Sequence, residues 1–305
     1  MKFTIFQNSR IGSRKTNQDR MAYSYSHDAL LMVVADGLGG YLHGEIAAQI
    51  AIRRLTDSFQ RQAAPRLKDC PAFLYESLSD SHYAIHDFAL KHGLLETPRT
   101  TCVACIVQDG AAHWAHAGDS RLYFFRNTSL LTKTRDHSRV QQLLDTQAIT
   151  AEDASVHPDR NKIYNCLGGM YPPEIELSKK VGLRRGDTLL LCSDGLWGPL
   201  SDDEMTLTMS LSPLIEASRQ LMEQAEFRGG ANGDNLTLVG MHWGDQKAAG
   251  DPDTVSTAGM PLDSVTTQFG DTGAGSLGGA APDISDEEIE RAIAEIHSAI
   301  KKYSG

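Results

Sequence analysis

Five aspartates in this chain stand beside glycines or small polar residues, where a strand or a turn begins or ends. They are Asp19, Asp36, Asp119, Asp194 and Asp234. A carboxylate at a strand end projects into the space where a sheet meets its loops, and neighbouring glycines let a backbone carbonyl approach it closely. Carboxylates that converge without basic partners repel one another, and Mg²⁺ or Mn²⁺ relieves that repulsion because these cations prefer oxygen ligands. A single Asp-Gly pair is usually only a turn, but five such aspartates in one chain predict a divalent-metal site.

The periodicity of apolar residues predicts the elements that must hold these aspartates. Alternation or short apolar runs predict strands at 3–7, 29–36, 101–108, 112–117, 121–126, 130–134, 187–193 and 235–242. Helical spacing predicts helices at 45–62, 71–93, 139–144, 202–209 and 213–226. Short turns such as Asp109-Gly110 join successive strands, which indicates antiparallel hairpins. Two helices early and two late, with strands between them, predict an α+β fold with helices layered on antiparallel sheet.

Composition narrows the class of protein. The 305 residues are 41% apolar and 22% charged, as in a globular chain. No apolar run approaches the ~20 residues of a membrane-spanning helix, and the first residues lack the apolar stretch of a secretory signal. We therefore expect a soluble, cytoplasmic protein with no membrane span. Residues 1–244 carry a net charge of −3 and residues 245–305 a net charge of −7, which argues against nucleic acid as the main partner.

The five cysteines show no disulfide framework. Cys102 and Cys105 have CxxC spacing, but they lie in a predicted strand, where residues three apart point to opposite faces. We expect buried structural thiols rather than a zinc or redox pair.

The composition changes near Gly244. We predict one folded domain at 1–244, a flexible acidic linker at 245–283 and an amphipathic helix at 284–305. Ser285 and Glu288 have the spacing of a capping box at the start of this helix. Its apolar stripe consists of Ile289, Ala292, Ile293, Ile296, Ile300 and Tyr303. This stripe can fold back on its own domain, or residues 284–303 can dock on a protein partner.

Short motifs containing the aspartates follow one another in a specific order. They are Arg14-x-x-Asn17-Gln18-Asp19, Val34-Ala35-Asp36-Gly37-Leu38-Gly39-Gly40, Thr100-Thr101, Ala117-Gly118-Asp119-Ser120-Arg121, Asp136-His137-Ser138, Leu191-Cys192-Ser193-Asp194-Gly195-Leu196-Trp197 and Gly233-Asp234-Asn235-Leu236-Thr237. Each motif is weak alone, but seven in this order and spacing are highly specific. Through them, residues 1–242 resemble the metal-dependent serine/threonine protein phosphatases of the 2C type, as a bacterial-like member.

The resemblance implies a fold and an activity. The fold would be a four-layer α-β-β-α sandwich at 1–244, two antiparallel sheets flanked by helix pairs, with a variable flap at about 145–180. The activity would be hydrolysis of phosphoserine and phosphothreonine on proteins by a metal-bridged hydroxide at a cluster of two Mn²⁺ or Mg²⁺ ions, with a third position. The substrates would be phosphoproteins of a Ser/Thr kinase that this enzyme opposes.

The resemblance also implies a set of metal ligands. Asp36 corresponds to the carboxylate that bridges both ions. Asp194 and Asp234 correspond to ligands of the first ion, and the Gly37 carbonyl to a ligand of the second.

Three further positions follow from the same motifs. Asp19 corresponds to a carboxylate that holds water on the metal, and Asp119 to the ligand of a third ion. Arg14 corresponds to the arginine that grips the substrate phosphate. The expected catalytic set is Arg14, Asp36, Asp194 and Asp234.

Several positions depart from the family or leave a choice. Eukaryotic members often place a general-acid histidine where this chain has Leu38, so no general acid is assigned, and we expect His43 and His116 to be structural. Cys166 stands where the family often has an arginine, so that substrate contact does not carry over. Two alternatives stay open: a phosphatase of a small phosphorylated metabolite, and a catalytically silent metal-binding scaffold that recruits a partner through its C-terminal helix.

Overall fold

Two antiparallel sheets face each other in the computed structural model, which describes residues 1–39, 43–244 and 254–270. In spatial order, the first sheet contains β12 (Thr254–Ser256), β1 (Lys2–Arg10), β11 (Leu236–Trp243), β10 (Thr188–Cys192), β6 (Arg121–Arg126) and β7 (Ser129–Lys133). The second contains β13 (Thr266–Phe269), β2 (Asp19–Tyr25), β3 (Ala29–Asp36), β4 (Cys102–Gln108), β5 (Ala111–Ala117) and β8 (Glu176–Leu177), and β9 (Val181–Gly182) also pairs with β5. Neighbouring strands pair antiparallel throughout.

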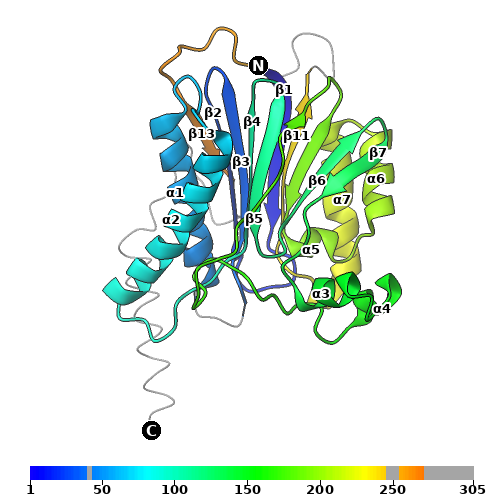
Figure 1. Ribbon diagram of the computed structural model, residues 1–305. Coiled ribbons are helices and arrows are strands. Elements are labelled where there is room, and N and C mark those ends of the chain that lie inside the picture. The colour runs from blue at the N-terminus through cyan, green and yellow to red at the C-terminus, as the bar shows by residue number, and fades with distance from the viewer. Residues whose placement is uncertain (40–42, 245–253, 271–305) are drawn as a thin grey trace.

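Helices cover the outer face of each sheet (Figure 1). The second sheet carries α1 (Gly44–Gln62) and α2 (Cys70–Lys91), and the first carries α5 (Asp194–Trp197), α6 (Asp202–Leu211) and α7 (Leu214–Gly229). Two shorter helices, α3 (Arg139–Asp145) and α4 (Ala151–Val156), lie near one end of the sandwich (Figure 1). The predicted four-layer α-β-β-α sandwich is confirmed. Within the described ranges, none of the helices has the length and apolarity to cross a bilayer.

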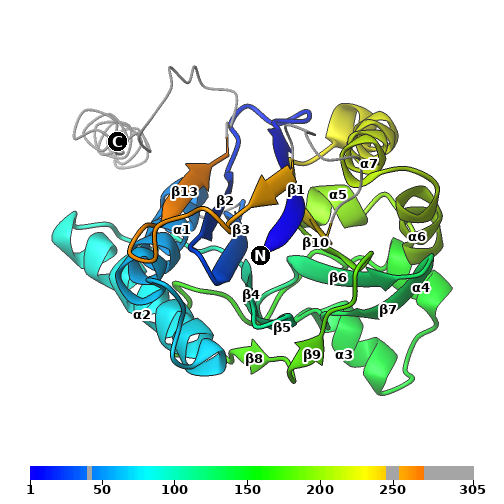
Figure 2. The same cartoon turned by 90° about the horizontal axis from the view of Figure 1, so that it is seen from above.

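Three apolar clusters fill the spaces between these layers. One lies between the two sheets and contains Met32, Val103 and Leu191. The others lie under the helix pairs, and Figure 2 shows this layering from above. Because the side chains of a strand alternate between faces, Cys102 packs under α1 and α2 while Cys105 packs between the sheets. All five cysteines are free and buried, which confirms the buried thiols predicted at Cys102 and Cys105.

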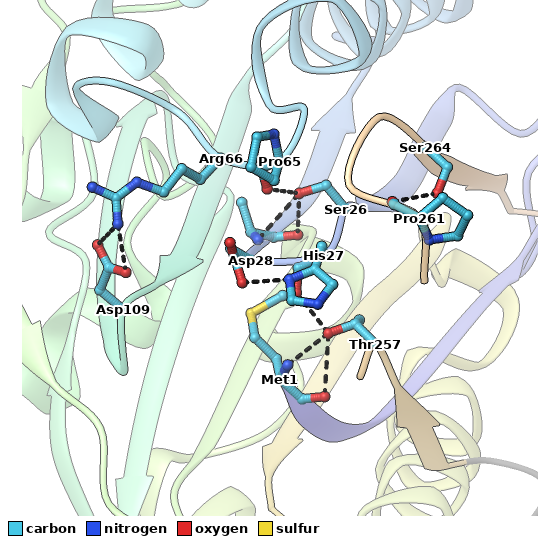
Figure 3. Close-up of polar contacts among 11 residues, drawn as sticks. Met1, Ser26, His27, Asp28, Pro65, Arg66, Asp109, Thr257, Pro261 and Ser264 are labelled. Atoms are coloured by element: carbon cyan, nitrogen blue, oxygen red, sulfur yellow. Dashed lines mark hydrogen bonds and ion pairs between the residues drawn. The ribbon is translucent and has the colours of Figure 1, made fainter. Parts of the chain in front are cut away.

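Residues 254–270 differ from the predicted flexible linker, because they add an edge strand to each sheet. β12 pairs with β1, and β13 pairs with β2. The Met1 amino group donates a hydrogen bond to Thr257 Oγ1 at 2.6 Å, and this hydroxyl donates to the carbonyl of His27 at 2.6 Å (Figure 3). The linker prediction is therefore wrong for these residues. The remaining linker residues and the helix predicted at 284–305 lie outside the described residues.

Candidate metal centre

The predicted aspartates lie where strand ends of both sheets meet. Asp19 opens β2 and is the register partner of Asp36, the last residue of β3. Asp119 lies in the turn between β5 and β6, Asp194 begins α5 shortly after β10, and Asp234 precedes β11. Since β10 and β11 belong to the first sheet and β2 and β3 to the second, the site requires both sheets.

A cleft of about 520 Å³ opens at this edge of the sandwich. Its lining includes six of the predicted site residues: Arg14, Asp36, Gly37, Asp119, Asp194 and Asp234. The seventh, Asp19, is 1% exposed and accepts a hydrogen bond on Oδ2 from Ser193 Oγ at 2.7 Å. The structure therefore gathers every site residue that the sequence predicted.

Two glycines allow the backbone packing that brings these carboxylates together. A Cβ atom on Gly195 would lie 2.0 Å from the carbonyl oxygen of Asn235, and one on Gly37 would lie 2.5 Å from the carbonyl oxygen of Gly44. A side chain at Gly195 would push α5 away from the turn before β11. Asp194 and Asp234 are neighbours because residue 195 has no side chain.

Burial and mutual repulsion disfavour the charged forms of these carboxylates. Burial, and then the charges of Asp19 and Asp194, raise the pKa of Asp36 well above its usual range. Burial raises the pKa of Asp194 to about 7 and that of Asp19 to about 6, and in both cases Asp234 adds repulsion. The pKa of Asp119 is also raised well above its usual range, by burial and by Asp194. A bound cation would reverse these effects because it favours the charged carboxylates.

The donor set fits hard divalent cations. Among the described residues that line the cleft there is no histidine and no cysteine, so the candidate ligands are oxygens, as Mn²⁺ and Mg²⁺ prefer. Asp19 Oδ1 is buried and has no hydrogen-bond partner within the described chain. Within the described residues, a group of three ligand atoms that all lie within 4.8 Å of one another is found at His116, His137 and Glu176. The aspartates of the cleft do not form such a group. The aspartate oxygens are therefore spaced more widely than in one compact three-ligand site.

Arg14 and Asp234, predicted to bind phosphate and metal, contact each other directly. Arg14 Nη2 donates to Asp234 Oδ2 at 2.5 Å, and the two side chains are 52% and 38% exposed. Since exposed ion pairs are weak, a cation or a phosphate group can compete for either partner. The pair places the predicted phosphate ligand at the edge of the carboxylate cluster.

Asn235 holds the loop that carries Arg14, a role that the sequence reasoning missed. Its Oδ1 accepts from the backbone N–H of Gln18 at 2.8 Å, and its Nδ2 donates to the carbonyls of Ile11 and Thr16 at 2.8 and 3.0 Å. The only signal for this role was the position of Asn235 beside Asp234 in the last motif.

The flap contributes one wall of the cleft through Asn161 and Ile163, and nothing in the sequence singled out these residues. The histidines near the motifs have other positions. His43 precedes α1 and lies 3.4 Å from Glu45, and His116 Nε2 contacts the carbonyl of Arg135 at 2.7 Å. Leu38 lines the cleft, and its apolar side chain cannot act as a general acid.

Comparison with known proteins identifies relatives of similar sequence. A family model described as protein phosphatase 2C matches residues 6–230. A serine/threonine phosphatase of Listeria monocytogenes is 32% identical over 237 residues, which are 77% of this chain and 93% of that protein. The serine/threonine protein phosphatase PstP of Mycobacterium tuberculosis is 33% identical over 228 residues, which are 75% of this chain and 42% of that protein.

Solved structures show the same similarity. The crystal structure of the M. tuberculosis phosphatase PstP has a TM-score of 0.70 and 31% identity, and the match covers 80% of this chain and 100% of that one. A structure of the PstP catalytic domain in complex with two manganese ions has a TM-score of 0.68 and 30% identity, with the same coverage.

Proposed function

Because the chain belongs to the protein phosphatase 2C family, we propose that it is a metal-dependent phosphatase that hydrolyses phosphoserine and phosphothreonine on proteins, with Mn²⁺ or Mg²⁺ as cofactor. The observation that carries this function is the cleft in which buried carboxylates from both sheets meet an arginine. Relatives named as serine/threonine phosphatases favour protein substrates over a small metabolite. The presence of Arg14 and of every predicted carboxylate argues against a silent scaffold.

We assign the ion ligands within this cleft as follows. Asp36 is the candidate bridging ligand by its position in the family motif, and a cation would stabilise its charged form, which burial and then the charges of Asp19 and Asp194 disfavour by raising its pKa. Asp194 and Asp234 are candidate ligands of one ion and the Gly37 carbonyl of the other. Asp119 is the candidate ligand of a third ion, with Asp194 shared.

The chain's own groups bind and orient the reactants. When bound, the ions supply Lewis acidity, which activates water and offsets charge on the phosphoryl oxygens. Arg14 presents a planar guanidinium that suits two phosphoryl oxygens better than an ammonium does, once Asp234 releases it. The unpartnered Oδ1 of Asp19 is available to orient water beside Asp36.

The cysteines argue against a covalent route through a thiolate. Burial raises the pKa of the Cys166 thiol, and burial also raises the pKa of Cys192. Both thiols therefore stay protonated and weakly nucleophilic near neutral pH.

The substrates are phosphoproteins, and we propose that they are products of a Ser/Thr kinase that this enzyme opposes. We also propose a cytoplasmic location, which the five free cysteines support because reducing compartments keep thiols unpaired.

The test is phosphate release from a phosphothreonine peptide with Mn²⁺, with EDTA and with Asp194→Asn. We expect release that requires Mn²⁺ and is reduced at least about a hundredfold by the substitution, since a metal ligand is lost. Asp109→Asn is the matched control, because Asp109 lies in an exposed hairpin turn and pairs with the exposed Arg66 (Figure 3). Release that persists in EDTA, or an Asp194→Asn enzyme as active as the control, would contradict the proposal. Release from phosphorylated metabolites but from no phosphopeptide would support the alternative substrate class.

A further inference from the structure

The turn that carries Asp119 is held by a residue outside the metal site. Gly118 has φ +115°, and a Cβ on it would lie 2.5 Å from Thr101 Cβ, so this backbone is tightly packed. The His137 N–H donates to the carbonyl of Gly118 at 3.0 Å, and the Gly118 N–H donates to His137 Nδ1 at 3.2 Å. One residue therefore binds both polar backbone groups of the glycine that precedes Asp119.

The His137 ring is in turn oriented by the flap. Asn165 Nδ2 donates to His137 Nδ1 at 2.6 Å. The orientation of this amide is fixed by the backbone of Glu174, whose carbonyl accepts from Nδ2 at 2.6 Å and whose N–H donates to Oδ1 at 3.0 Å. Because Nδ1 accepts two hydrogen bonds, the proton of the neutral ring is on Nε2.

This tautomer also decides what the cluster of His116, His137 and Glu176 is. His137 Nε2 lies 3.4 Å from Glu176 Oε2 and faces it as a donor. A metal at Nε2 would need a lone pair there, so we read these side chains as a structural group rather than a metal site: His137 contacts Glu176 and stacks on the His116 ring, with the ring centroids 4.5 Å apart.

The segment that carries Asn165 also forms the flap wall of the cleft. Ile163 lines the cleft and bridges to Ser138, and the Tyr164 N–H donates to the carbonyl of His137 at 3.0 Å. The opposite side of the Asp119 turn is held by α5, because Trp197 Nε1 donates to the carbonyl of Asp119 at 3.0 Å. The flap wall and the Asp119 turn thus share His137 as their link.

We propose that His137 and Asn165 are positioning residues that tie the flap wall to Asp119 and so set the affinity for the divalent ion that Asp119 holds. This inference rests on the proposed function, in which Asp119 is a ligand of a third ion. The link has two hydrogen-bonded steps, from Asn165 to His137 and from His137 to Gly118. Breaking either step removes one of the contacts that hold the turn, while the His137 backbone and Trp197 keep theirs, and it lowers the affinity at Asp119 without touching a ligand.

The test measures Mn²⁺ binding to the metal-free, full-length protein, with free Mn²⁺ followed by its electron paramagnetic resonance signal. Asp119→Asn first identifies the site that depends on Asp119, because that variant must lose it. We expect Asn165→Ala and His137→Leu to raise the dissociation constant of this site about fivefold, the equivalent of one net hydrogen bond, with the other sites unchanged. His137→Asn should restore tight binding, because an amide oxygen can accept at the position of Nδ1.

A second variant in the flap separates this link from general flap stability. Thr150 caps α4 by accepting the N–H of Asp153, and Thr150→Ala removes that cap without touching the link. We expect Thr150→Ala to leave all Mn²⁺ affinities unchanged. Hydrogen exchange supplies a further readout, because the Gly118 amide should exchange faster in His137→Leu and at the native rate in Thr150→Ala.

Unchanged affinity at the Asp119-dependent site in Asn165→Ala would overturn the proposal, and this variant decides the question if His137→Leu fails to fold. An equal loss in Thr150→Ala, or an equal loss at every site, would also overturn it. Failure of the proposed function looks different: the wild-type protein would then bind Mn²⁺ in this pattern and release no phosphate from phosphopeptides.

Discussion

The metal-free protein should lose stability as the pH rises, because its buried carboxylates are held protonated. In EDTA, the folded state binds a proton at Asp194 up to a pKa of about 7, whereas the ordinary value is 3.8. The folded state thus binds more protons than the unfolded state between these values, so this group's contribution falls as the pH rises through that window. The perturbation that isolates it is Asp194→Asn, which has a similar shape and does not titrate.

The magnitude follows from the difference between the two pKa values. At ~1.4 kcal/mol for each pKa unit, Asp194 lowers the free energy of unfolding by roughly 2 kcal/mol at pH 5 and roughly 4 kcal/mol at pH 8. From pH 5 to pH 8, the free energy of unfolding of Asp194→Asn should therefore rise by about 2–3 kcal/mol relative to that of the wild type. Asp36 and Asp19 also lose a charged neighbour in the variant, which acts in the same direction.

The assay is urea unfolding of both proteins in EDTA at pH 5, 6, 7 and 8. Subtracting the free energy of unfolding of one protein from that of the other removes the contribution of buried histidines such as His82. Burial lowers the pKa of His82 to about 4, so its contribution to stability rises with pH. With Mn²⁺ bound, the wild type should be the more stable of the two proteins, because a cation stabilises the charged carboxylate and the variant has lost a candidate ligand. A free-energy difference in EDTA that stays constant, or that grows in favour of the wild type with rising pH, would refute the reasoning.

Three further substitutions test one contact that stabilises the fold and two that hold the site. Asp187→Ala should lower the free energy of unfolding by about 2 kcal/mol in urea, because Asp187 is 1% exposed and binds Arg126 through contacts of 2.8 and 2.6 Å; no change would show that Arg126 reaches solvent at no cost. Gly195→Ala should weaken Mn²⁺ binding by at least about tenfold in a dialysis titration, because the new Cβ would meet the Asn235 carbonyl at 2.0 Å; native affinity would mean that the backbone relaxes easily. Asn235→Ala should raise the KM for a phosphopeptide about tenfold by freeing the Arg14 loop, and an unchanged KM would separate Arg14 from phosphate binding.

Much of the molecule could be predicted from local sequence. The apolar run at Ala29–Asp36 and the helical spacing from Glu45 to Gln62 lie in β3 and α1, because burial of one face imposes a period on the chain. The edge strands β12 and β13 were missed because each has only three or four residues and pairs with a strand more than 200 residues away in the sequence. The ion pair between Asp187 and Arg126 joins residues 61 positions apart, and no local pattern in the sequence indicates it.

The order of residues along the chain establishes which groups this protein has for chemistry: aspartates at strand ends, glycines beside them and an arginine in the first motif. Their types and order follow from the chain alone, because oxygen donors select hard cations whatever the fold. The folded arrangement was needed to show that both sheets supply the carboxylates, that Arg14 contacts Asp234, and that His137 joins the flap to the Asp119 turn. These contacts join residues far apart in the sequence, and only the packing of two sheets and their loops sets such distances.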